Sequence, residues 1–119
     1  METIKINNTV LEYNKIIYID SVNGNDETGD GSEINPYKTL QYSLNKASSN
    51  EAIYVMPGTY TVRAIHDIFD KKYVDIIGKG YDSNIIIEGN KGSYAQYTGG
   101  NITNNFYRIR FSISENFAS

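Results

Sequence analysis

The chain has 119 residues, of which 39% are apolar, and it carries a net charge of −3 at neutral pH. These values exclude a disordered chain and a membrane-embedded one, and the absence of a basic patch argues against nucleic acid as a partner. Cysteine is absent, so disulfides and thiol chemistry are excluded. The 11 tyrosines and the frequent isoleucines favour strands over helices.

The first half of the sequence predicts an arm, a strand, a long loop and a helix. Residues 1–15 alternate weakly, and Lys15–Asp20 has the apolar run of a strand. Ser21–Pro36 is polar and rich in Gly, Asn and Asp, which predicts one long loop. Thr39–Ala47 carries apolar residues at i, i+4 and i+7, so we expect a short helix with one buried stripe. The stripe consists of Leu40, Leu44 and Ala47.

The second half predicts short strands separated by turns. The strands are expected at Ala52–Met56, Thr59–Val62, Tyr73–Ile77, Ile85–Glu88, Tyr94–Thr98 and Phe106–Ile113. Val55 and Ile77 are 22 residues apart, and Tyr60 and Ile86 are 26 apart. This spacing is typical of one coil of a solenoid, although a meander or a small sandwich has similar strands and turns.

Several of these segments also match ordered motifs of a known family. Tyr18–Asp26 (YIDSVNGND), Gly29–Gly31 and Asn35–Leu40 (NPYKTL) come first in the chain. Ala52–Tyr60 (AIYVMPGTY) and Val74–Gly80 (VDIIGKG) follow. Together they resemble the opening segment of pectate-lyase-like right-handed parallel β-helix proteins. The resemblance covers about residues 16–89.

This resemblance implies an all-β fold, a right-handed parallel β-helix in a short solenoid with an N-terminal capping α-helix. We expect an arm at 1–15, a strand, loop and capping helix at 16–51, and the first coils at 52–119. Both ends of a solenoid need a cap. No equivalent cap is visible after Ser114, so we expect either the remainder of a longer chain or a homo-oligomer, for example a trimer.

The long loop contains the candidate metal ligands. Asp20, Asn23, Asn25, Asp26 and Asp30 supply oxygens at short spacing between glycines, and Ca²⁺ takes oxygen ligands of this kind. The spacing differs from that of an EF-hand. In the alternative interpretation, the same side chains form Asx-turns and bond the backbone of the loop. Apart from calcium, no cofactor is expected.

Tyrosines are the candidate ligand-binding residues. Tyr94, Tyr97 and Tyr107 could stack on sugar rings, or they could fill half-buried strand positions. The single histidine, His66, lies in a predicted loop without a nucleophile motif nearby, so we expect a surface residue. No catalytic motif of the lyases is present, and we assign no catalytic residue.

Three functions remain open from the sequence. The first is a non-catalytic structural or glycan-facing β-helix module of a phage-tail-like or cell-surface protein. The second is the N-terminal part of a polysaccharide lyase or other carbohydrate-active enzyme whose active site lies outside this chain. The third is a small self-associating β-domain without a glycan ligand. Residues 1–11 lack the apolar region of a signal peptide. We expect an extracellular, cell-surface or phage-particle location, with a polysaccharide as the candidate partner.

Overall fold

A computed structural model describes residues 1–63, 66–71, 73–87 and 104–113. The described residues are mostly β, with one helix of seven residues and one single helical turn. The chain begins with an antiparallel hairpin of β1 (Glu2–Ile6) and β2 (Thr9–Tyr13). Two parallel sheets follow. Neither described helix has the length and apolar character needed to cross a bilayer.

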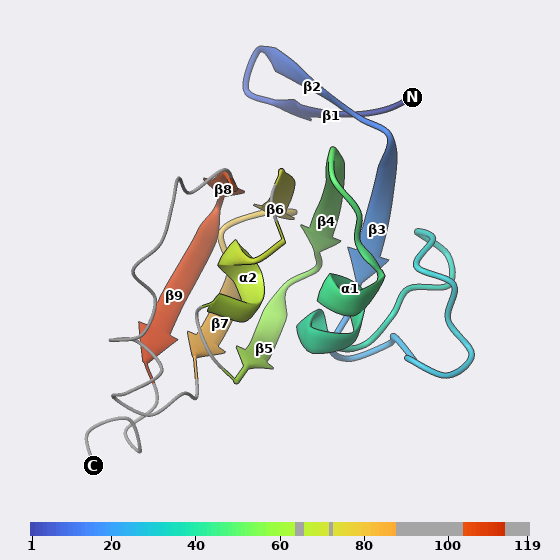
Figure 1. The fold of residues 1–119 in the computed structure, drawn as a ribbon, viewed down its shortest axis with the longest axis vertical. Coiled ribbons are helices and arrows are strands. Elements are labelled where there is room, and N and C mark those ends of the chain that lie inside the picture. Colours follow the sequence, from blue (N-terminus) through green and yellow to red (C-terminus); the bar gives the residue numbers. More distant parts are fainter. Residues whose placement is uncertain (64–65, 72, 88–103, 114–119) are drawn as a thin grey trace.

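The first parallel sheet has the order β3-β4-β6-β8. Its strands are β3 (Lys15–Ile19), β4 (Glu51–Val55), β6 (Val74–Gly78) and β8 (Phe106–Tyr107). The second has the order β5-β7-β9, with β5 (Gly58–Val62), β7 (Ser83–Ile87) and β9 (Ile109–Ile113). The chain passes from the first sheet to the second after β4, β6 and β8, so the strands of the two sheets follow the same order across the molecule (Figure 1).

Most predicted strands are confirmed to within one or two residues, and the structure adds their register, which the sequence did not give. Val55 pairs with Gly78 and Tyr60 pairs with Ile85, each one residue from Ile77 and Ile86, whose spacing indicated the length of a coil. A shift of one residue moves a side chain to the other face of a strand, so pattern alone sets register poorly. The predicted strand Phe106–Ile113 is wrong in one respect, because it breaks at Arg108 between β8 and β9. The strand predicted at Tyr94–Thr98 lies outside the described residues.

The core lies between the two sheets and beneath the helices. In-register isoleucines at positions 17, 53 and 76 are at most 1% exposed, and Tyr60 and Val62 come from the second sheet. Helix α1 (Leu40–Lys46) adds Leu40 and Leu44 to the same cluster, and its cap residue Ala47 is also buried. The predicted apolar stripe is therefore confirmed. Thr39 begins the helix by accepting a hydrogen bond from the Tyr42 amide.

The long loop covers the outer edge of β3. The Tyr18 amide donates to the Gly31 carbonyl at 2.7 Å, the Tyr37 amide donates to the Tyr18 carbonyl at 3.1 Å, and the Asp20 amide donates to the Tyr37 carbonyl at 2.8 Å. A Cβ at Gly24 would lie 2.1 Å from the Tyr37 carbonyl oxygen, so only glycine fits at this crossing. Covering an edge strand in this way satisfies backbone groups that would otherwise pair with another chain.

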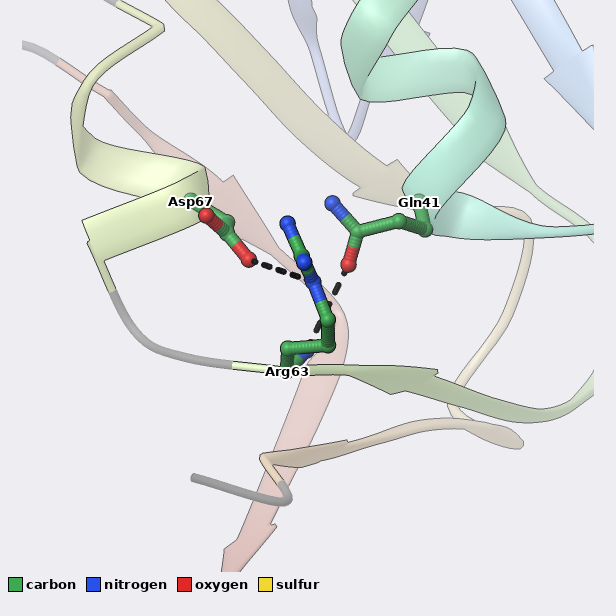
Figure 2. A network of polar contacts seen from close by, with 3 residues as sticks. All are labelled: Gln41, Arg63 and Asp67. Atoms are coloured by element: carbon green, nitrogen blue, oxygen red, sulfur yellow. Dashed lines mark hydrogen bonds and ion pairs between the residues drawn. The ribbon is translucent and has the colours of Figure 1, made fainter. Parts of the chain in front are cut away.

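Helix α2 (His66–Phe69) is a single turn that joins β5 to β6. The prediction that His66 lies in a loop is therefore wrong. Figure 2 shows the polar contacts at this point: the Arg63 amide donates to Gln41 Oε1 at 3.4 Å, and Arg63 Nε lies 3.7 Å from Asp67 Oδ2. The contacts connect the end of β5 with both helices.

Candidate functional site

The first half of the predicted calcium loop bonds its own backbone. Asp20 Oδ1 accepts hydrogen bonds from the amides of Val22 and Asn23, at 2.9 and 3.0 Å. Burial raises the pKa of Asp20, but these two amides and the Asn23 side chain outweigh it and lower the pKa. Asn25 Oδ1 accepts from the Glu27 amide at 2.8 Å in the same way. These contacts are Asx-turns.

The second half of the loop connects to the capping helix. Asp26 Oδ1 accepts from the amides of Lys38 and Thr39, at 2.8 and 3.1 Å, and its Oδ2 accepts from the Thr39 hydroxyl at 2.6 Å. Asp30 Oδ1 accepts from the Ser32 amide at 2.9 Å, and the Ser32 hydroxyl and amide lower the pKa of Asp30. Asp26 therefore connects a loop to the first residues of a helix that are far from it in sequence.

Asp20, Asn25 and Asp30 form Asx-turns, whereas Asp26 bonds the residues at the start of the capping helix. Within the described residues, no group of three or more His, Asp or Glu side chains has an arrangement that could hold a metal ion. Asn side chains and backbone oxygens are also common calcium ligands. The calcium site stays a prediction.

Of the predicted sugar-binding tyrosines, Tyr94 and Tyr97 lie outside the described residues. Tyr107 is half-buried in β8, on the outward face of the first sheet. Its register partners on that face are Ile77 in β6, then Tyr54 in β4, then Tyr18 in β3. We call Tyr18, Tyr54, Ile77 and Tyr107 the outer row. Neighbouring strands lie about 4.8 Å apart, so the row forms a continuous aromatic and apolar strip.

The outer row is anchored but remains accessible. The Tyr18 and Tyr54 ring centroids are 5.4 Å apart at 70°, an edge-to-face pair. Ile77 is fully buried, whereas the three tyrosines are only partly buried. The row packs against Tyr13 and other apolar side chains of the N-terminal hairpin. The hairpin therefore packs against the outward face of the sheet that carries the strip.

A groove of about 440 Å³ opens beside Tyr18. Its walls are Glu2 and Thr3 of the hairpin, Lys15, Ile16 and Tyr18 of β3, and loop residues 30–33. Burial raises the pKa of Tyr18, and the negative charges of Glu33 and Glu2 add to the effect. The groove thus combines an aromatic ring with carboxylates, an amine and a serine hydroxyl, which are groups able to hydrogen-bond sugar hydroxyls.

A buried polar contact holds the hairpin on the sheet. The Tyr13 hydroxyl donates to Asp75 Oδ2 at 2.6 Å, and Asp75 Oδ1 accepts from the amide and the side chain of Asn105, at 3.0 and 3.2 Å. Tyr13 is 6% exposed, and its pKa is raised well above the ordinary tyrosine value by burial and by the hydrogen bond to Asp75. This contact joins β2 to β6 across the outward face.

Tyr18 and Tyr54 are the site residues that sequence reasoning missed. Each occupies the second position of an Ile-Tyr-Ile or Ile-Tyr-Val triplet, and Tyr107 follows Phe106 in the same way. Aligning the triplets on their inward residues, Ile17, Ile53 and Phe106, would have placed the three tyrosines in one row.

Two comparisons with known proteins match the chain, and they cover different shares of it. The described residues form a mostly β protein with parallel sheets. A family model described as "Protein of unknown function (DUF1565)" matches residues 22–111. The chain belongs to this family, which is associated with right-handed β-helix proteins. It is also 37% identical over 51 residues to the probable cytoplasmic asparagine–tRNA ligase of Schizosaccharomyces pombe, which covers 43% of this chain but 9% of that protein. No solved structure matches the chain.

Proposed function

We propose that the chain is the N-terminal part of a pectate-lyase-like right-handed parallel β-helix, and that it is a non-catalytic module that binds glycans through the outer row. Such a module suits a tail-like particle or a cell-surface protein. The pairing order β3-β4-β6-β8 and β5-β7-β9 supports the helical path, because each passage of the chain adds one strand to each sheet. The family association supports the same fold.

The observation that carries the glycan proposal is the register of three tyrosines on one outward face. Aromatic faces suit the apolar faces of sugar rings, and the tyrosine hydroxyl adds a polar contact. A strip that crosses several strands suits an extended saccharide better than a small isolated ligand. The groove beside Tyr18 supplies hydrogen-bonding groups at one end of the strip.

The capping elements fit a structural role alongside binding. The loop saturates the β3 edge, and α1 places Leu40 and Leu44 in the core. Both contacts close the N-terminal end of the sheets against pairing with other chains.

The test is binding of neutral and acidic oligosaccharides on an array, followed by calorimetry. We expect Tyr54→Ala to weaken binding at least about tenfold, as expected for an aromatic contact at the centre of an interface. Tyr42→Ala is the matched control, because Tyr42 and Tyr37 form a similar edge-to-face pair, at 4.9 Å and 72°, away from the outer row. Its binding should equal that of the wild type.

Two outcomes would contradict the proposal. Absence of binding to every saccharide would remove the glycan role, and equal losses in Tyr54→Ala and Tyr42→Ala would assign the effect to stability. Incubation with acidic polysaccharides tests the non-catalytic part, because release of unsaturated product would show a lyase.

A further inference from the structure

A second surface hollow lies at the corner where the chain passes from β8 to β9. It has a volume of about 240 Å³, and within the described residues it is lined by Tyr81, Arg108, Ile109 and Arg110. Two arginines and a tyrosine therefore line one small hollow. The carboxylate-rich groove beside Tyr18 is a separate site with none of these residues.

Contacts of its side chain and its backbone define the position of Arg108 at the corner. Its guanidinium lies 5.6 Å from the centroid of the Tyr81 ring, and its Nη1 donates to the Lys79 carbonyl at 3.2 Å. A Cβ at Gly78 would lie 2.4 Å from the Arg108 carbonyl oxygen, so glycine is required for this close approach. The Arg108 backbone adopts φ = 59°, a left-handed conformation that long side chains rarely adopt.

Within the described residues, the charges of this hollow are not neutralised. No described carboxylate forms an ion pair with Arg108 or Arg110, although the whole chain has a net charge of −3. Arg63 provides the contrast, because its guanidinium lies beside the Asp67 carboxylate (Figure 2). Two positive side chains that line one hollow favour a bound anion.

We propose that this hollow, which we call the arginine corner, binds a phosphate or sulfate monoester group. A carboxylate has two oxygens and is satisfied by one guanidinium fork, whereas a phosphate or sulfate monoester presents three terminal oxygens. Two arginines therefore match the tetrahedral group better. Tyr81 is 75% exposed and offers its ring to the carrier of the anion. The arginine corner acts independently of glycan binding at the outer row.

The experiment measures binding of glucose 6-phosphate and glucose 6-sulfate by NMR titration at low salt. Glucose 6-phosphate and glucose 6-sulfate should bind, glucuronate should bind more weakly, and glucose should not bind at the corner. Arg110→Gln should weaken binding about tenfold, and raising the salt concentration should weaken it further. Arg110 is exposed, so this change leaves the core intact. Arg63→Gln is the control with the same change of charge, and it should bind as the wild type does.

Several results would overturn the arginine corner. The absence of any NMR shift with either ester at low salt would overturn it. Equal weakening of ester binding in Arg63→Gln and Arg110→Gln would also overturn it, because it would show non-specific attraction. Equal affinity for glucuronate would contradict the preference for a tetrahedral group. Inorganic phosphate tests whether the sugar that carries the anion is contacted. If inorganic phosphate binds as tightly as glucose 6-phosphate, Tyr81 contributes nothing to binding, and the proposed contact with the sugar is wrong. Tyr54→Ala should not change any of these titrations, so failure here is separate from failure at the outer row.

Discussion

Alternate residues of the same strands lie on two faces of the first sheet, and the side chains on the two faces differ in exposure. On the inward face, Ile17, Ile53 and Ile76 are at most 1% exposed and pack into one core. On the outward face, Tyr18 and Tyr54 are partly exposed at the adjacent positions. The inward isoleucines are constrained by packing density, whereas the partly exposed Tyr18 and Tyr54 are constrained less. The comparison predicts that stability and binding separate by strand position.

The largest expected effect comes from the inward row. Ile53 is fully buried in β4 between β3 and β6, so Ile53→Ala leaves a cavity that the neighbouring strands cannot fill. We expect the free energy of unfolding to fall by about 2–5 kcal/mol, measured by urea denaturation. Tyr54→Ala, one residue along the strand, should cost about 1 kcal/mol, the centre of the range for single substitutions. Similar losses in the two variants would refute the division into faces.

The inward row was largely predictable from the sequence, whereas the outward site was not. Apolar runs such as Lys15–Asp20 and Ala52–Met56 predicted strands, and the stripe of α1 predicted its buried face. The outer row depends on register across four strands, and the sequence did not give that register, because a shift of one residue moves a side chain to the other face. The Tyr13–Asp75 contact joins residues 62 positions apart, which no local pattern encodes.

The long loop shows a different limit of prediction from sequence. Its Asp and Asn residues were predicted to be structural turns or calcium ligands, and the two interpretations require the same residue types. What the sequence could not indicate is that Asp26 reaches Lys38 and Thr39, 12 and 13 residues away. Such a contact depends on how the loop folds back along β3.

A smaller effect is expected where the hairpin covers the outward face. Tyr13→Phe removes the hydrogen bond to Asp75 and should lower the free energy of unfolding by about 1–3 kcal/mol at pH 7, measured by urea denaturation. The exposed-site control Tyr81→Phe should stay within about 0.5 kcal/mol of the wild type. A loss in Tyr13→Phe no larger than in this control would show that the hairpin is held by apolar packing alone.

The same variant predicts a pH dependence. The pKa of Tyr13 is raised in the folded chain, so the folded state keeps a proton that the unfolded chain loses above its ordinary value of about 10. The contribution of Tyr13 is therefore fully present below pH ~10 and is lost as the pH rises above it. The difference between wild type and Tyr13→Phe should be constant from pH 7 to 9 and shrink at higher pH. A constant difference through pH 11 would contradict this linkage.

The smallest effect separates the loop's two interpretations. Asp26→Ala removes three hydrogen bonds from an accessible carboxylate, so we expect a loss of about 1 kcal/mol in the presence of a chelator. If the loop is purely structural, calcium leaves the melting temperature of the wild type unchanged, and the loss in Asp26→Ala is the same with and without calcium. If calcium binds, it raises the melting temperature of the wild type, and both Asp26→Ala and Asp30→Ala abolish the rise. Because Asp26 also connects the loop to α1, only the calcium-dependent part of its effect bears on metal binding.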